Sequence, residues 1–325
     1  LGLRKGISDV YKSSEFNDLG EKLQTEGLRT HFLGPVSDAQ MRAEPLKITS
    51  YDEMREPFSH LAVRQIQITK PLESKAAGRS VMDYRAVTSA PAPKLIPLEV
   101  VFRFSLPEGS SLIERVKKDP SYLSQLLLPK EIIESGKLPA GYRVDFPILE
   151  LFTKLESTDR PLAWTEALAI SGLSGAQLQD LLFRTAWAAG FLKAAFHHVG
   201  LELADGKFEW GMDQDGSIFM VDSIGPDELR ILKNGMQLSK EVLRHYYRKT
   251  KWYEMVGVAK RQAQAVGSAD WKKFVGDAPP ALPEEQKLLV SQMYQSLTNV
   301  ITGREWFKDA PSLDEVCQKL KEIAG

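Results

Sequence analysis

Cysteine, unbalanced charge and long apolar runs are all scarce in this sequence. Cys317 is the only cysteine among the 325 residues, which excludes an intrachain disulfide and a cysteine-based zinc site. The 42 basic and 43 acidic residues give a formal net charge of −1 at pH 7. Without a basic excess we expect neither a nucleic acid nor a membrane as a partner, although a local patch can still bind a small anion.

The shortness of the apolar runs bears on the compartment. A membrane-spanning helix needs roughly 20 consecutive apolar residues, and the longest runs in this chain are far shorter. Residues 1–6 contain no apolar core of the length that a signal peptide has. We therefore expect a cytoplasmic protein.

What the sequence does contain is an ordinary globular composition, 43% hydrophobic and 26% charged. A chain of 325 residues exceeds what one compact core usually covers, so we expect two lobes that share a cleft. Residues 61–69 alternate apolar with polar side chains and residues 95–104 are rich in Val, Leu and Phe, which predicts two strands separated by a polar excursion. A short helix is predicted from Leu19 to Glu26.

From about Ser111 the pattern becomes helical. The clearest predicted helix begins after Ser174, a good N-cap residue, and runs to Val199 before Gly200. The predicted fold class is therefore α+β, with a β-rich N-terminal lobe at 1–104 packed on a larger α+β lobe at 105–325.

Downstream of this helix the period changes to two. Charged and large apolar side chains alternate, the charged ones being Asp205, Lys207 and Glu209 and the apolar ones Phe208, Trp210 and Met212. The turn sequence at 213–216 and an apolar run at 217–222 predict a return strand. If Phe219 and Val221 lie with Phe208 and Trp210, then Asp222 falls on the charged face.

Two carboxylates and one ammonium group on neighbouring strands suit a nucleotide. Mg²⁺ bound to ATP takes one or two carboxylates plus phosphate oxygens, and a nearby Lys neutralises phosphate charge. Glu209 and Asp222 are then close enough to bridge one Mg²⁺, and without the cation we expect a raised pKa on one of them or a counter-charge from Lys207. An exposed hairpin face is ordinarily charged, so alternation alone favours a solvated surface.

Several segments in a fixed order give the pattern more weight. They are Pro97-Leu98-Glu99 with Arg103 and Gly109-Ser110, Lys154 with Asp159 and Pro161, Asp205-Gly206-Lys207 with Glu209-Trp210-Gly211, Asp222 with Pro226-Asp227 and Arg230, Lys240 with Arg244, and the tail segments 282–285 and 297–303. Together they resemble the longer form of the SAICAR synthetase (phosphoribosylaminoimidazole-succinocarboxamide synthase) family. The resemblance covers most of residues 95–303.

The resemblance implies an enzyme of purine biosynthesis, with ATP in the cleft between the two lobes and a helical extension at the C-terminus. It implies an ATP-dependent ligase that joins L-aspartate to the carboxylate of 5-aminoimidazole-4-carboxylate ribonucleotide through an acyl phosphate. The products are SAICAR, ADP and phosphate, and the implied cofactors are ATP and Mg²⁺. The sequence leaves open whether the protein forms a homo-oligomer.

The resemblance also implies roles for individual residues. Glu209 and Asp222 are the implied metal ligands and, with Lys5, the ATP-binding residues; Lys207 and Asp159 are the implied catalytic residues. The implied 5′-phosphate site consists of Arg103, Ser110 and Arg230, which we expect to converge. The other implied substrate contacts are Asp205, Asp227, Lys240 and Arg244.

Departures from the family pattern concentrate near the N-terminus. Ser8 stands where a second basic residue is usual, which puts phosphate binding by this loop in doubt and leaves Lys5 alone. The stretch between Tyr11 and Leu19 replaces a family segment several times longer, and we expect a break in the chain or poor order there. Ser223 and Phe104 replace a common Glu and Asn. A small-molecule kinase-like phosphotransferase and a diverged family member with another substrate stay open as alternatives.

Overall fold

The computed structural model describes residues 7–37, 40–42, 47–77, 79–107, 110–156, 158–266, 268 and 270–324. The chain forms two compact units. The N-terminal unit consists of Leu1–Ala195 and Leu203–Ile224, and the C-terminal unit of Phe196–Glu202 and Gly225–Gly325. Each unit is described by itself.

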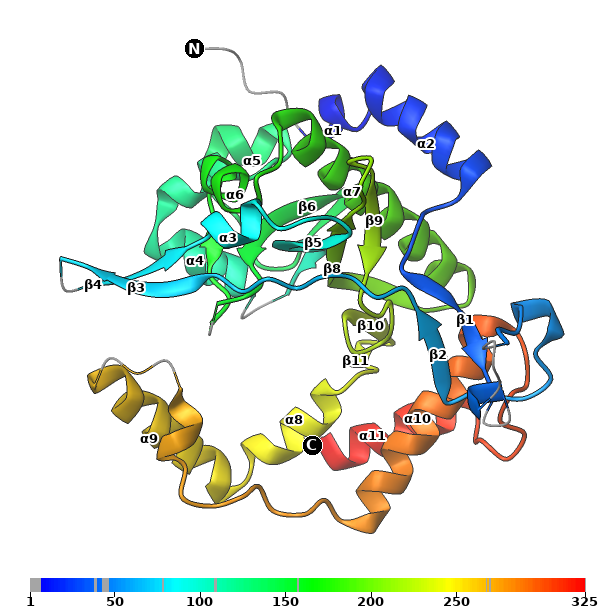
Figure 1. The fold of residues 1–325 in the computed structure, drawn as a ribbon. Coiled ribbons are helices and arrows are strands. Elements are labelled where there is room, and N and C mark those ends of the chain that lie inside the picture. Colours follow the sequence, from blue (N-terminus) through cyan, green and yellow to red (C-terminus); the bar gives the residue numbers. More distant parts are fainter. Residues whose placement is uncertain are drawn as a thin grey trace. The chain divides into compact units, whose positions relative to one another are not determined.

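An antiparallel sheet forms the centre of the N-terminal unit (Figure 1). Its middle strand, β5 (Lys94–Leu106), pairs with β6 (Tyr142–Thr153) on one side and with β8 (Glu202–Met212) on the other. Two short strands extend it, since β7 (Pro161–Leu162) pairs with β6 and β9 (Ile218–Val221) pairs with β8. Nearly every residue of β5 is buried, which fits its run of branched and aromatic side chains.

The helix α7 (Gly175–His198) confirms the helix predicted after Ser174. Ser174 Oγ accepts the backbone N–H of Gln177 at 3.2 Å, and Gln177 Oε1 accepts the N–H of Ser174 at 3.0 Å, so both ends of a capping box are present. At the other end Gly200 has φ +74°, a left-handed conformation that glycine adopts without strain. The helix therefore starts and stops where its sequence signals stand.

The remaining elements of the N-terminal unit lie outside this sheet. The helices are α1 (Ile7–Val10), α2 (Ser14–Glu26), α3 (Arg85–Thr88), α4 (Ser111–Lys118), α5 (Lys130–Ser135) and α6 (Trp164–Ser171), and the strands are β1 (Phe32–Val36), β2 (His60–Val63), β3 (Leu72–Ala76) and β4 (Arg79–Asp83). β1 pairs with β2 and β3 with β4 in two separate ribbons. The predicted excursion between the strands is therefore the β3–β4 hairpin.

The strand predicted at 61–69 is shorter than expected. β2 ends at Val63, and the side chain of the next residue, Arg64, pairs with Asp213, with Nη1–Oδ2 and Nη2–Oδ1 distances of 2.7 and 2.9 Å. Further along, the Gln67 backbone donates to Pro93 O and accepts from Leu95 N, so this residue joins the start of β5 instead.

The predicted break between Tyr11 and Leu19 is wrong. The chain passes directly from Tyr11 into α2, where Ser13 Oγ accepts the N–H of Phe16 at 3.3 Å as the N-cap. Tyr11 is 3% exposed, and its ring lies 5.3 Å from that of Phe146 and 5.0 Å from that of Phe16. The short connection is therefore packed and capped.

The C-terminal unit is mainly helical. It contains the hairpin β10 (Leu229–Lys233) and β11 (Met236–Gln237), followed by α8 (Glu241–Arg248), α9 (Lys251–Ala265), α10 (Glu284–Thr302) and α11 (Leu313–Ala324). α10 and α11 lie side by side (Figure 1), and Ser296 Oγ donates to Pro311 O at 2.7 Å. No helix in the described ranges combines the length and apolar character that a membrane crossing requires.

The mixture of helices with a mainly antiparallel sheet confirms the predicted α+β class. The predicted lobe boundary after residue 104 falls within β5, whereas the two compact units divide at Ala195 and Ile224. The predicted lobes were defined by the ATP cleft between them, whereas the two units are defined by their compactness. The lobes at 1–104 and 105–325 therefore stay a prediction.

A close approach of β8 to β9 generates a test of the sheet. A Cβ added to Gly211 would lie 2.7 Å from Cζ of Phe219, whereas a Cβ added to Gly190 in α7 meets nothing within 4 Å. We expect Gly211→Ala to lower the free energy of unfolding by about 1–3 kcal/mol through overpacking. The matched Gly190→Ala should raise it by about 0.5–1 kcal/mol. Urea unfolding of both variants measures this, and equal effects would contradict the packing described.

Candidate functional site

The strand register gathers charged side chains on one face of the sheet. Glu99 of β5 lies opposite Glu209 of β8, and Arg103 lies opposite Asp205, while Lys207 lies opposite an apolar residue of β5. Directly opposed residues of an antiparallel pair share a face, and so do every second residue along a strand. These five residues therefore define one charged face.

Two ammonium groups join the two opposed glutamates. Lys207 Nζ lies 2.8 Å from Oε1 of both Glu99 and Glu209. Lys154 Nζ, just beyond the end of β6, lies 3.1 Å from Glu99 Oε1 and 2.6 Å from Glu209 Oε1. We call these four residues the glutamate–lysine cluster. The glutamate side chains are buried and the lysine side chains are about three-quarters buried, so the charges are only partly screened by water.

Asp222 joins this cluster by a route that the sequence did not predict. Val221, the last residue of β9, lies opposite Glu209, so the expected register is wrong by one residue. Continued strand alternation would turn Asp222 to the other face. Asp222 instead has φ +64°, and its Oδ2 lies 3.8 Å from Lys207 Nζ. The carboxylates of Asp222 and Glu209 therefore meet at Lys207, as predicted.

The pKa values reflect this crowding. Burial raises the pKa of Glu209 above its ordinary value, although Lys154 and Lys207 both oppose the shift. Partial burial also acts to raise the pKa of Asp222, but the net shift is downward because of hydrogen bonds with the Ser223 backbone and Glu209 and the charge of the lysines. The expected counter-charge is therefore present in Lys207, whereas the raised pKa of Glu209 comes from burial and not from repulsion by Asp222.

Asp159 belongs to the same neighbourhood. Its pKa is raised, first by burial and then by the charge of Glu99, while Lys154 and Lys207 lower it. Asp159 is therefore close enough for Glu99, Lys154 and Lys207 of the cluster to act on its pKa.

A second cluster lies further along the charged face. Arg103 is 7% exposed, and its guanidinium lies 2.6 Å from Glu150 Oε2 and 3.4 Å from Asp205 Oδ2. Glu150, opposite Val101 in β6, is 1% exposed and also accepts from Arg115 and Tyr122. A buried carboxylate requires such partners, because an unpaired buried charge is costly.

Ser110 lies beside this second cluster. Its hydroxyl is buried and has no hydrogen-bond partner among the described residues, while the adjacent Ser111 accepts from Arg103 Nη2 at 3.2 Å. A buried hydroxyl that lacks a partner is uncommon and suits a group that a ligand completes.

The remaining predicted residues lie elsewhere. Asp227, Arg230, Lys240 and Arg244 belong to the C-terminal unit, and the structure does not determine how the two units are placed relative to one another. Convergence of Arg103, Ser110 and Arg230 therefore stays a prediction. Lys5 and Gly109, and the side chain of Ser8, lie outside the described residues.

Sequence reasoning gave no role to several charged residues that the structure places in the clusters. Glu99 and Lys154 stood within quoted motifs. An even spacing in a strand places Glu99 on one face with Arg103, just as it places Lys207 with Glu209. Glu150 stands within an apolar run, and an acid in such a strand signals a buried partner. These two signals could have found them.

The charged face can accommodate a cation that arrives with phosphates. The described residues contain no group of three or more His, Cys, Asp or Glu side chains arranged to hold a metal ion by themselves. However, Glu99, Glu209, Asp222 and Asp159 outnumber Lys154 and Lys207 by two negative charges. Mg²⁺ at a nucleotide needs only one or two carboxylates, since phosphates and water complete its coordination.

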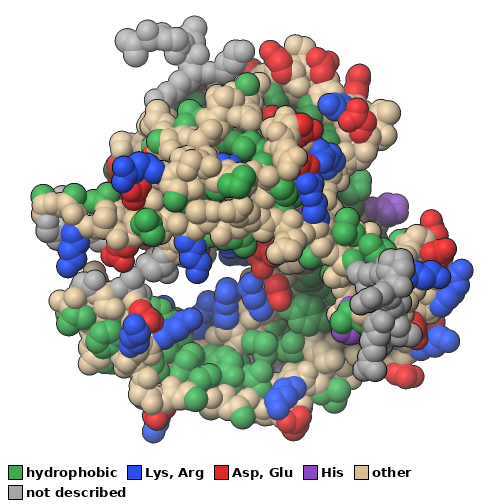
Figure 2. Space-filling model, in the orientation of Figure 1, with side chains coloured by type: hydrophobic (Ala, Val, Ile, Leu, Met, Phe, Trp, Pro, Cys, Tyr) green, Lys and Arg blue, Asp and Glu red, His purple; other side chains and the backbone are tan. Residues whose placement is uncertain are grey.

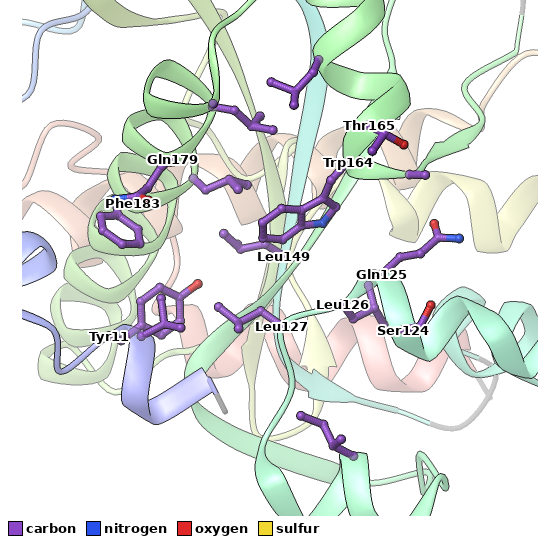
Figure 3. Close-up of a pocket in the computed structure, with 17 residues that line it drawn as sticks. Tyr11, Ser124, Gln125, Leu126, Leu127, Leu149, Trp164, Thr165, Gln179 and Phe183 are labelled. Atoms are coloured by element: carbon purple, nitrogen blue, oxygen red, sulfur yellow. The ribbon is translucent and has the colours of Figure 1, made fainter. Parts of the chain in front are cut away.

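A pocket of about 680 Å³ lies on the opposite face of the sheet (Figure 3). Leu149, the neighbour of Glu150 in β6, lines it together with Trp164 of α6 and Leu178 and Leu182 of α7. None of its lining residues is charged, so it lacks the groups that phosphates and carboxylates require. Side chains with such groups lie instead on the charged face.

Comparison with known proteins bears on this chemistry. The family model for SAICAR synthetase matches residues 17–258. A putative phosphoribosylaminoimidazole-succinocarboxamide synthase of Archaeoglobus fulgidus is 35% identical over 304 residues, which are 93% of this chain and 83% of the relative. The Thermoplasma acidophilum phosphoribosylaminoimidazole-succinocarboxamide synthase is 30% identical over 65% of this chain and 69% of its own length.

Solved structures are more distant. A SAICAR synthetase from Pyrococcus horikoshii is 21% identical with a TM-score of 0.48, over 92% of this chain and 84% of that one. A SAICAR synthase from Saccharomyces cerevisiae, complexed with SAICAR, is 18% identical with a TM-score of 0.47, over 90% and 81%. Likenesses this remote support no argument about the site.

The second cluster generates a stability test. Glu150→Gln keeps the side-chain shape but removes the buried carboxylate that Arg103 and Arg115 share, and Asp205 alone stays beside Arg103. We therefore expect the free energy of unfolding to fall by about 3–5 kcal/mol. As the matched control, Glu114→Gln removes an exposed pair with Lys117 and should cost less than about 1 kcal/mol. Urea unfolding followed by circular dichroism compares the two. A similar loss in both variants would show that the buried pairing contributes little.

Proposed function

We propose that this chain, which belongs to the SAICAR synthetase family, is a phosphoribosylaminoimidazole-succinocarboxamide synthase. It is an ATP-dependent ligase of de novo purine biosynthesis that joins L-aspartate to the carboxylate of 5-aminoimidazole-4-carboxylate ribonucleotide. The observation that carries the proposal is the glutamate–lysine cluster with Asp222 beside it, at the positions of the family motifs.

The reaction needs activation of a poor acceptor. A free carboxylate does not release oxide, so ATP first transfers its terminal phosphoryl group to a carboxylate oxygen, giving an acyl phosphate and ADP. The aspartate amine then attacks the acyl carbon, phosphate leaves, and the amine loses its proton. The protein positions the reactants and neutralises charge, without a nucleophilic side chain.

ATP binds at the glutamate–lysine cluster in this proposal. Lys154 and Lys207 neutralise phosphate oxygens, while Glu209 and Asp222 are the residues that would hold Mg²⁺. A bound Mg²⁺ would offset the local negative excess and the charge that develops on the phosphates. Lys5 is proposed as a further phosphate contact.

The ribonucleotide and aspartate occupy the rest of the site. Arg103, Ser110 and Arg230 bind the 5′-phosphate, and the buried hydroxyl of Ser110 has no partner among the described residues that it must give up. Asp205 keeps Arg103 oriented. Asp159 contacts the imidazole amine, and its raised pKa makes it a better proton acceptor than an ordinary aspartate.

The C-terminal unit supplies cations for the carboxylates. Lys240 and Arg244 stand one helical turn apart at the start of α8, which places both on one side of the helix. Asp227 lies at the same end. We propose that these residues bind the carboxylates of the substrates.

A diverged family member with another substrate is the second candidate. It is favoured by one observation, the short, capped connection from Tyr11 into α2, where the family has a longer segment. Family membership leaves the kinase-like alternative with no observation in its favour. We place the reaction in the cytoplasm, with small-molecule substrates and with neither a nucleic acid nor a membrane as a partner.

A coupled assay decides between these functions. Purified protein is given ATP, Mg²⁺, L-aspartate and the imidazole carboxylate ribonucleotide, and phosphate release is followed with each substrate omitted in turn. If the proposal is correct, phosphate is released only when both L-aspartate, which supplies the amine, and the imidazole carboxylate ribonucleotide are present. ADP formation without aspartate supports a kinase, and activity only with a different acceptor supports the diverged member.

A single substitution tests Asp222 as a ligand of the proposed Mg²⁺. Asp222→Asn keeps the shape and removes one charge, so ATP should still bind weakly while turnover falls by at least about 100-fold, because the metal acts mainly in the transition state. Asp180→Asn, at a partly buried i,i+4 pair with Arg184 on α7, is the control and should keep its turnover, because it lies outside the proposed site. Near-normal turnover of Asp222→Asn at saturating Mg²⁺ would exclude Asp222 from the metal site.

Another substitution tests Arg230 as a contact of the 5′-phosphate. Arg230→Ala should raise the KM for the ribonucleotide at least about tenfold, since a charge-assisted contact contributes about 1.5–3 kcal/mol. Arg85→Ala, which removes an exposed guanidinium paired with Asp83, should leave this KM unchanged. Initial rates at varied ribonucleotide measure both, and an unaltered KM in Arg230→Ala would remove this residue from the site.

A further inference from the structure

The start of α8 is held by a carboxylate from outside the helix. Lys240 occupies the N-cap position, and its side chain makes no capping hydrogen bond. Asp227 Oδ1 instead accepts the backbone N–H of Lys240 at 3.1 Å. A carboxylate at a helix N-terminus pairs with otherwise unsatisfied donors and with the positive end of the helix dipole. Asp227 therefore fixes the point from which Lys240 and Arg244 project.

Asp227 Oδ1 also accepts a hydrogen bond from a residue of α10. Tyr294, in the middle of α10, donates its hydroxyl to Asp227 Oδ1 at 2.5 Å across 67 residues of sequence. Burial and the hydrogen bond to Asp227 raise the pKa of Tyr294, so the phenol keeps its proton and stays a donor at neutral pH. The position of Tyr294 is fixed by the packing of α10, since its neighbours Met293 and Leu297 are almost fully buried.

The side chain of Lys240 is oriented from the same loop. Its Nζ lies 3.4 Å from Oε1 of Glu228, the residue after Asp227. Two consecutive acidic residues thus fix Lys240, one through its backbone and one through its ammonium group. A shift of Asp227 would move both contacts, because these residues share one short loop before β10.

We propose that Tyr294 is a positioning residue for the substrate-carboxylate site of α8. Through Asp227 it fixes the start of the helix that presents Lys240 and Arg244, and so it couples the C-terminal helical extension to aspartate binding. The inference rests on the proposed function, because it takes α8 as the carboxylate-binding element. Figure 2 shows Lys and Arg side chains gathered where α8 lies in the C-terminal unit, as a dicarboxylate ligand requires.

The kinetic test removes only the hydroxyl. Tyr294→Phe should raise the KM for L-aspartate at least about fivefold, because the orientation of the cations is lost, while the KM for ATP stays unchanged, since Lys207 and Glu209 belong to the other unit. Tyr142→Phe is the matched control, because it removes a tyrosine-to-carboxylate bond of 3.0 Å to Glu131. Equal changes in both Michaelis constants of Tyr294→Phe would show a general loss of structure and overturn the proposal.

A double-mutant cycle tests the route. If Tyr294 acts through Asp227, then Tyr294→Phe adds nothing to the aspartate KM of Asp227→Ala. Additive effects would show that Tyr294 acts by another route and would overturn the proposal.

Hydrogen exchange separates this inference from the proposed function, since it needs no turnover. Amides at the start of α8 should exchange at least about fivefold faster in Tyr294→Phe than in the unaltered protein, and amides of α11 should not change. An unaltered protein that makes no aspartate-dependent product refutes the proposed function, while the exchange result still decides whether Tyr294 sets the start of α8. An active enzyme whose Tyr294→Phe variant keeps its aspartate KM refutes the inference alone.

Discussion

Two buried glutamates facing each other across neighbouring strands are the constraint on which the N-terminal unit depends. Glu99 and Glu209 are directly opposed in the ladder, and like charges in such a pair destabilise a sheet. Lys154 and Lys207 remove the repulsion by lying between them. The same ammonium groups are those that a nucleotide's phosphates require. The charges that the sheet itself must neutralise therefore hold in place the two cations that we propose for phosphate binding.

The sequence predicted those parts of the fold whose signals are local. Ser174 and Gly200 mark both ends of α7, and the structure places the helix between them. The register of β9 was wrong because all four of its residues are buried, so no alternation distinguishes its two faces. The expected break after Tyr11 failed for another reason, since a family segment was assumed to be needed where Ser13 simply caps α2.

The candidate site was predictable on one strand and hidden on its neighbours. Alternation identified Lys207 and Glu209 correctly as one charged face. Their partners Glu99 and Lys154 come from segments far away in the sequence, and only the strand order β8–β5–β6 brings them together. Glu150 received no predicted role because the apolar residues around it indicate only a buried strand. Contacts between distant strands depend on register, which composition and periodicity do not encode.

The contact between Gly211 and Phe219 has a consequence for evolution. Gly211 of the Glu209-Trp210-Gly211 motif is required because the ring of Phe219 on the next strand leaves no room for a Cβ. The requirement is one of packing. Relatives in which position 219 holds a small side chain are therefore free to replace the glycine, and the two positions should vary together. Loss of this glycine in a homologue is therefore not by itself evidence of lost activity, whereas loss of Glu209 is such evidence if the proposed metal site is correct.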